Sequence, residues 1–188
     1  MTKHDTEIET GSRVACRILV MGASGTGTST LARGLADRLA TQAFDTDDFF
    51  WVPTDPPFQT VRPIKERLQL AEMMFLPRRD WVLGGSPMGW STQVVARLTH
   101  VIFLTLDGDV RCQRLRKRET QRYGAAILPG GDMADEHNVF MKWAQGYDNP
   151  EFSGRNILKH RQMLSTLDVP VFEFDSAQPA DVLLESAV

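Results

Sequence analysis

The sequence predicts an α/β fold in which helices cover both faces of a parallel five-stranded sheet and part of the chain forms a helical lid. Short apolar runs alternate with helical patterns along the 188 residues. Strands that are apolar throughout are typical of a parallel sheet buried on both faces. With 42% hydrophobic residues, the chain suits a single domain with a sizeable core.

The elements are expected in the following order. The five strands are "CRILVMG", "QAFDTDD", "DWVLGG", "HVIFLTLD" and "VPVFEFD". Helices are expected at about 29–41, from Pro63 to about Leu76, at 93–98, along the basic "VRCQRLRKRETQRYG", at 135–145, at 155–167, and after Pro179. Asp109 is expected to cap the basic helix, Gly124 to end it, and "AAILPGGDM" to be a loop. The predicted organisation is a flexible tail over residues 1–13 and one domain over 14–188, with the lid at about 114–135.

Composition excludes several classes of protein. The net charge of -3 argues against bulk affinity for nucleic acid or anionic membranes. We find no apolar run near the roughly 20 residues that cross a bilayer, and the polar start is unlike a secretory signal. Cys16 and Cys112 lie too far apart for a cysteine framework, so we expect reduced, buried thiols in a cytoplasmic protein.

The stretch "GASGTGTS" follows the first strand and resembles a phosphate-binding loop. The full pattern is G-x-x-x-x-G-K-[ST], and here Thr28 replaces the lysine. Converging backbone amides and a helix N-terminus still favour an anion, and the Ser29 hydroxyl is suited to Mg²⁺. A plain glycine-rich turn is the alternative. The residues predicted to bind nucleotide are Gly22, Ala23, Ser24, Gly25, Thr26, Gly27, Thr28, Ser29 and Thr30.

A phosphate site without its lysine needs another cation. Arg114, Arg118 and Arg122 repeat at four-residue spacing on one face of the basic helix, next to a glycine-rich segment that suits a moving lid. They are predicted to close over the transferred phosphate. A solvated basic face is the alternative interpretation.

Acidic and glycine residues at neighbouring strand ends predict an acceptor site. Asp47 is the first candidate for binding Mg²⁺ with Ser29 or for holding an acceptor hydroxyl, followed by Asp45 and Asp48. A turn or helix cap would account for only one of these acids. Further substrate candidates are Arg62, Gly85 and Ser86.

Together these motifs resemble the adenylate-kinase-like group of P-loop small-molecule kinases, which includes nucleoside-monophosphate, shikimate and gluconate kinases and topology-modulation proteins. The matching motifs are "GASGTGTST", "DTD", "RLRKR" and "DSAQP". The resemblance implies a nucleotide-binding fold that uses ATP and Mg²⁺, and a monomer. The departures are Thr28 and the "GGSPM" segment, where Gly84 and Met88 replace the acid and arginine of adenylate kinase.

The resulting prediction is a cytoplasmic kinase that moves the γ-phosphate of ATP to a small hydroxyl or phosphate acceptor. One alternative is a nucleotide-binding regulatory module that has lost turnover. Another is a loop that holds a different anion or nothing, with the basic helix docking an acidic protein or RNA; the net charge weighs against RNA.

Overall fold

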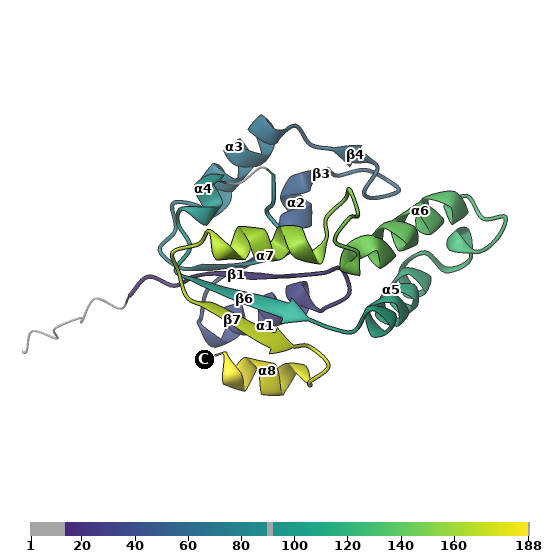
Figure 1. The fold of residues 1–188 in the computed structure, drawn as a ribbon. Helices are drawn as coiled ribbons and strands as arrows, with labels where there is room; N and C mark the ends of the chain where they lie inside the picture. The colour runs from purple at the N-terminus through teal and green to yellow at the C-terminus, as the bar shows by residue number, and fades with distance from the viewer. Residues whose placement is uncertain (1–13, 90–91, 188) are drawn as a thin grey trace, which may run out of the picture.

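The computed structural model describes residues 14–89 and 92–187, and its centre is a five-stranded sheet (Figure 1). The strand order is β2-β5-β1-β6-β7, and every neighbouring pair is parallel. The strands are β1 (Arg17–Gly22), β2 (Ala43–Asp45), β5 (Trp81–Gly84), β6 (His100–Thr105) and β7 (Val171–Asp175). The predicted α/β fold is confirmed. The tail predicted at 1–13 lies outside the described residues.

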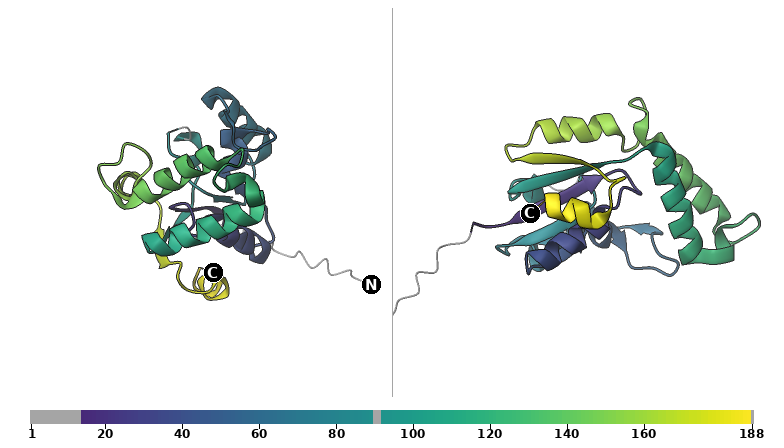
Figure 2. Two further views of the ribbon diagram at one scale, coloured as in Figure 1. Left: turned by 90° about the vertical axis from the view of Figure 1, so that its right-hand side faces the viewer. Right: turned by 90° about the horizontal axis from the view of Figure 1, so that it is seen from below.

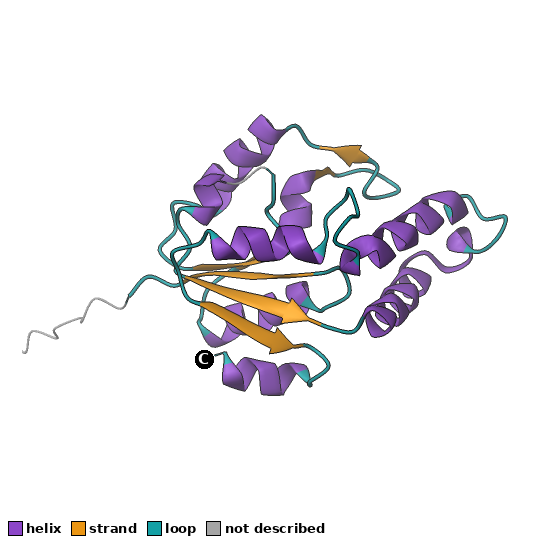
Figure 3. Cartoon of the chain, viewed as in Figure 1, coloured by secondary structure: helices purple, strands orange, loops and turns teal. Residues whose placement is uncertain are grey.

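Helices cover both faces of this sheet (Figures 1 and 3). The alternation of side chains along β1 sends Ile18 and Val20 to one face and Leu19 and Met21 to the other. The first face packs against α1 (Thr28–Arg38) and α8 (Ala180–Ser186). The second packs against α2 (Thr46–Phe50), α3 (Ile64–Met74), α4 (Thr92–Val95) and α7 (Ile157–Ser165).

A helical pair projects beyond the carboxyl edge of the sheet, where the lid was predicted (Figure 2). It consists of α5 (Gly108–Tyr123), the 3-10 turn η1 (Gly124–Ile127) and α6 (Ala134–Gln145), and η2 (Gly146–Asp148) follows. The pair has its own small core, in which Cys112 and Leu115 of α5 pack against Met141 and Ala144 of α6. This separate core lets the pair behave as one unit.

Four local expectations need correction. The cap of α5 is Asp107, whose carboxylate accepts hydrogen bonds from the Asp109 and Val110 amides, because Asp109 already lies inside the helix. The expected loop after Gly124 begins with the η1 turn. The expected second strand stops at Asp45, and the following acids form α2. Cys112 is buried as expected, but Cys16 is only half-buried.

A short antiparallel pair, β3 (Trp51–Val52) with β4 (Thr60–Val61), was not expected from the sequence. Each strand has two residues, too few for a period-two pattern to show. The pair lies between α2 and α3, on the side of the sheet edge that also holds the phosphate-binding loop (Figure 1).

Candidate functional site

The loop between β1 and α1 has the backbone of an anion site. Gly27 takes the left-handed conformation, with φ of 92°, immediately before Thr28 begins α1. The Thr26 amide and hydroxyl both donate to the Ala23 carbonyl, at 3.2 and 2.8 Å, which curls the loop on itself. Gly27 has no side chain with which to cap α1, so the first amides of the helix face outward with their partial positive charge.

Ser29 connects this loop to the acid cluster. Its hydroxyl donates a hydrogen bond of 2.5 Å to Asp45 Oδ2, and Asp45 Oδ1 in turn accepts from the Asp47 amide at 3.0 Å. A hydroxyl and a carboxylate side by side are hard oxygen ligands of the kind that Mg²⁺ prefers. Among residues 14–89 and 92–187, no group of three or more acidic, histidine or cysteine side chains is placed to hold a metal by itself. A magnesium ion here would therefore depend on phosphate oxygens and water for its other ligands.

Asp47 and Asp48 extend from the first turn of α2 and are solvent-exposed. Although Asp47 remains open to solvent, the surrounding protein partly desolvates its carboxylate, and this desolvation and then the charge of Asp45 raise the pKa of Asp47, while Arg155 and Arg118 act in the opposite direction. The pKa of Asp48 is raised by the same two causes. A carboxylate whose pKa is raised is a better proton acceptor than an ordinary one, which suits a general base.

The three predicted lid arginines lie on α5 but contact different parts of the molecule. Arg114 donates to the Ser176 carbonyl at 3.0 Å, in the loop after β7. Arg118 pairs with Glu119 at 2.9 Å and is the one of the three whose charge acts on the Asp47 pKa. Arg122 lies 5.6 Å from the Phe58 ring, in the loop that joins β3 to β4. Through Arg114 and Arg122, α5 thus contacts both sides of the sheet edge.

The predicted acceptor residues surround α2. Arg62 donates to the Phe49 carbonyl at 3.0 Å and to the Trp51 carbonyl at 2.9 Å, so its guanidinium shapes this segment. Gly85 has φ of 105°, and a β-carbon there would lie 1.9 Å from Thr46 Oγ1. Only glycine can therefore pass between β5 and α2 at this point.

Ser86 begins a buried chain of three polar side chains. Its hydroxyl lies 3.1 Å from His160 Nε2, and His160 Nδ1 lies 2.7 Å from the Tyr147 hydroxyl. Burial raises the pKa of Tyr147 to about 12, so its phenol keeps its proton. Burial and then the charge of Arg155 lower the pKa of His160 to about 3, so the ring is neutral. The neutral ring carries one N–H, so it donates to one of its two neighbours, Ser86 or Tyr147, and accepts from the other.

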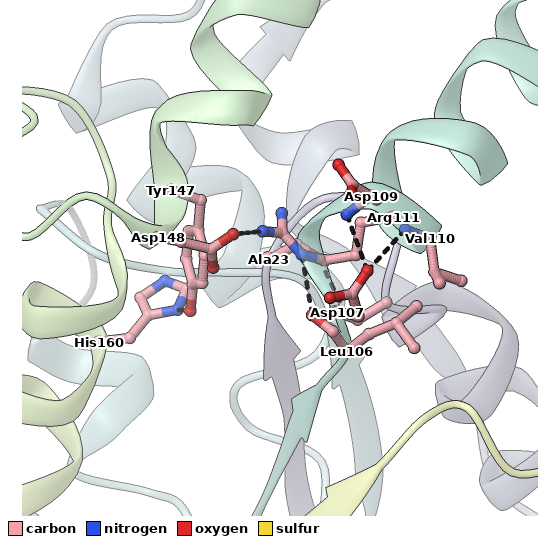
Figure 4. A network of polar contacts seen from close by, with 10 residues as sticks. Ala23, Leu106, Asp107, Asp109, Val110, Arg111, Tyr147, Asp148 and His160 are labelled. Atoms are coloured by element: carbon pink, nitrogen blue, oxygen red, sulfur yellow. Dashed lines mark hydrogen bonds and ion pairs between the residues drawn. The ribbon is translucent and has the colours of Figure 1, made fainter.

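Arg111 joins the two ends of the lid (Figure 4). It is 1% exposed, donates from Nε to the Leu106 carbonyl at 3.2 Å, and forms an ion pair with Asp148. Its guanidinium also lies 5.1 Å from the Tyr147 ring. The backbone of Gly25 packs against the Arg111 carbonyl, where a β-carbon would come within 2.9 Å. The base of α5 therefore packs against the loop between β1 and α1.

Arg155 is the site residue that the sequence analysis missed. Its Nη2 donates to Ser24 Oγ in the loop at 3.1 Å, although the two residues are 131 positions apart. It lies in the "SGRN" stretch outside any recognised motif, at the expected start of the helix at 155–167, whereas α7 begins only at Ile157. No local signal distinguished it from a surface arginine.

Comparisons with known proteins agree with this architecture. Shikimate kinase from Bacteroides thetaiotaomicron has a TM-score of 0.55 and 15% identity, covering 92% of this chain and 96% of that one. A gluconokinase from Sinorhizobium meliloti 1021 has a TM-score of 0.51 and 16% identity, covering 93% and 90%. At these identities the likeness establishes the fold of P-loop small-molecule kinases. Within the described part of the chain, no helix is long and apolar enough to span a membrane.

The comparison of sequences identifies a family. No known family profile matches the chain. A protein of Bacillus subtilis (strain 168), "Uncharacterized protein YqaC", is 36% identical over 158 residues, which are 84% of this chain and 87% of the relative. The chain therefore belongs to the same family as YqaC, and it has the fold of the P-loop small-molecule kinases.

Proposed function

We propose that this protein is a kinase that transfers the γ-phosphate of ATP to a small acceptor with a hydroxyl or phosphate group. The observation that carries the proposal is the contact between Ser29 of the loop and Asp45 of the acid cluster, 2.5 Å apart at the carboxyl edge of the sheet. Ligands of open α/β sheets bind at this edge. The contact brings an anion site, two oxygen ligands and an acceptor side together in one place.

The loop from Gly22 to Thr30 would hold the phosphates through its amides and the start of α1. Mg²⁺ would neutralise charge on the phosphates, and the residues that fit it are Ser29 and Asp45, with Asp47 reaching it through water. This pairing favours Asp45 over Asp47 as the direct partner of Ser29. Arg114, Arg118 and Arg122 would keep the lid closed and the water out.

Asp47 would receive the proton of the acceptor. The acceptor oxygen attacks the γ-phosphorus, the bond from that phosphorus to the bridging oxygen of ADP breaks, and a hydroxyl acceptor loses its proton to a carboxylate oxygen of Asp47. Ser86, Gly85, Asp48 and Arg62 would line the acceptor side. Ser86 would contact the acceptor through its hydroxyl group, which His160 Nε2 holds in place from 3.1 Å.

Titration calorimetry with a non-hydrolysable ATP analogue, with and without Mg²⁺, tests the nucleotide site. Affinity in the micromolar range that needs Mg²⁺ is the expected result, and panels of hydroxyl and monophosphate metabolites would then be screened for ADP release. A wild-type protein without affinity for the analogue would contradict the proposal.

Thr28 favours a second candidate, a nucleotide-binding regulatory module without turnover. A loop without lysine lacks one charge-assisted bond to phosphate, worth about 1.5–3 kcal/mol. The binding and ADP-release experiments described above distinguish the two candidate functions. A regulatory module binds the analogue but releases no ADP with any acceptor, whereas a kinase does both.

A further inference from the structure

We propose that Arg155 supplies the positive charge that Thr28 lacks, by contacting the terminal phosphate of the bound nucleotide beside the loop. This inference rests on the proposed nucleotide site and assigns its missing cation to a residue outside the loop and outside the basic face of α5. It makes Arg155, which follows the lid in the chain, a determinant of the preference for triphosphate over diphosphate.

The position of Arg155 is the first support. Its Nη2 donates to Ser24 Oγ at 3.1 Å, and Ser24 lies in the middle of the loop between Gly22 and Gly27. The amides on either side of Ser24 are those that surround phosphate in a loop of this pattern. A guanidinium held against Ser24 lies next to any phosphate that the loop binds, and its planar fork matches phosphate oxygens in pairs.

The chain holds Arg155 in this position. Its guanidinium lies 4.8 Å from the Trp143 ring centre, on α6. The next residue, Asn156, is 1% exposed and caps α7 by accepting from the Lys159 amide at 2.8 Å. Asn156 Nδ2 also donates to the Pro150 and Phe152 carbonyls, at 3.0 and 2.8 Å. The loop before α7 is thereby fixed, so less side-chain entropy is lost when a ligand binds.

The charge of Arg155 has no direct counterion in the part of the chain that the structure describes. Among residues 14–89 and 92–187, no carboxylate forms an ion pair with it, and its Nε is shielded from solvent without a hydrogen-bond partner. Burial lowers the pKa of Arg155 while Asp47 and Tyr147 raise it, yet an arginine remains charged. A shielded cation with an unused donor is unfavourable by itself and becomes favourable when an anion binds beside it.

Three arginines of α5 make contacts away from the loop or within the helix itself. Arg114 is bound to the Ser176 carbonyl and Arg118 is paired with Glu119. Arg111, the buried arginine at the base of α5, is paired with Asp148 through Nη2, while its Nη1 has no hydrogen-bond partner. Arg155 differs from these arginines because it contacts a loop side chain, Ser24, directly and forms no ion pair among the described residues. Its contact with Trp143 links it to α6.

Calorimetry on four proteins tests the inference: wild type, Arg155→Gln, Arg155→Lys, and the control Arg161→Gln. Arg161 lies six residues further on and pairs with Glu173 at 2.8 Å in an exposed position. We expect Arg155→Gln to weaken binding of the non-hydrolysable ATP analogue at least about tenfold and that of ADP less than about threefold. The affinity of Arg155→Lys for the analogue should lie between those of Arg155→Gln and wild type. Arg161→Gln should bind the analogue as tightly as wild type does. Thermal unfolding verifies that each variant is folded.

A second comparison adds Thr28→Lys. If Arg155 performs the task of the absent lysine, Thr28→Lys should restore affinity for the analogue in the Arg155→Gln background and improve it less in wild type. An Arg155→Gln protein that binds the analogue as wild type does, or that loses ADP and analogue affinity equally, overturns the inference and leaves the nucleotide site intact. A wild type that binds neither nucleotide overturns the proposed function itself. If Arg155→Gln is unfolded, Arg155→Lys is used for the test instead. An Arg155→Lys protein that binds the analogue as tightly as wild type counts against the inference.

Discussion

His160 should make the stability of this protein depend strongly on pH in the mildly acidic range. The ring is fully buried between Ser86 and Tyr147, and its pKa falls from 6.5 to about 3 on folding. Between those two values the unfolded chain binds a proton that the folded chain does not. Stability contributed by the neutral ring is therefore complete above 6.5 and decreases as the pH falls through this window.

The expected magnitude follows from linkage. Inside the window, each fall of one pH unit lowers the free energy of unfolding by ~1.4 kcal/mol for one titrating group. From near pH 7 to about pH 5 the loss due to His160 comes to about 2 kcal/mol. Asp47, whose pKa is raised on folding, changes stability in the opposite direction. A comparison between variants is therefore needed to isolate the histidine.

Urea unfolding, followed by tryptophan fluorescence at several pH values, measures the effect. The variant His160→Gln keeps a hydrogen-bonding group but cannot titrate, so its stability should fall by about 2 kcal/mol less than that of wild type over this range. His100→Gln, at the half-buried start of β6, is the matched control and should follow wild type. The NMR resonance of the His160 ring in wild type should also stay unchanged down to about pH 5.

Two results would refute this reasoning. One is a pair of stability curves for wild type and His160→Gln that stay parallel within about 0.5 kcal/mol. The other is a titration of the His160 ring in the folded protein close to its ordinary pKa, which would mean that water reaches the Ser86–His160–Tyr147 chain. If His160→Gln does not fold, the ring titration in wild type decides alone.

Three further predictions concern the loop and the acid cluster. Ser29→Ala should abolish the Mg²⁺-dependent part of analogue binding in calorimetry while Ser29→Thr retains it, and equal Mg²⁺ dependence in both would exclude Ser29 as a ligand. Gly85→Ala should lower the melting temperature more than Gly89→Ala, because both have positive φ but only at Gly85 does the new β-carbon meet Thr46, at 1.9 Å; scanning calorimetry compares them. Asp47→Asn should raise the melting temperature slightly, since it removes repulsion among neighbouring carboxylates, and should lower phosphate transfer at least about a hundredfold. An Asp47→Asn protein with wild-type turnover would exclude the general base.

The sequence was sufficient for the sheet and for the edge where the site lies. Apolar strands such as "RILVMG" alternate with helices, and the carboxyl ends of parallel strands necessarily meet at one edge. The loop at 22–29 and the acids at 45–48 were placed there for that reason. Their direct contact through Ser29 and Asp45 was not predictable, because it depends on how closely α1 approaches β2 across β5.

Contacts between distant segments could not be predicted. Arg155 and Ser24 are 131 positions apart, and neither periodicity nor a motif joins them. The order of the strands, which places β5 between β2 and β1, is also invisible in local patterns. The direction of each arginine on α5 likewise depends on what packs around it. Spacing showed that Arg114, Arg118 and Arg122 share a face, but not that Arg114 reaches Ser176 and Arg122 approaches Phe58.

The ion pair between Arg111 and Asp148 has a consequence for how this family can diversify. It fastens the segment entering α5 to the segment leaving α6, so the 36 residues between them depart from the sheet and return to it at a single point. This segment also has its own small core, formed by Cys112, Leu115, Met141 and Ala144. It is therefore a structural unit whose two ends are joined at one place on the sheet. Such a unit can change in length or sequence at little cost to the stability of the sheet, as long as the ion pair between Arg111 and Asp148 is kept.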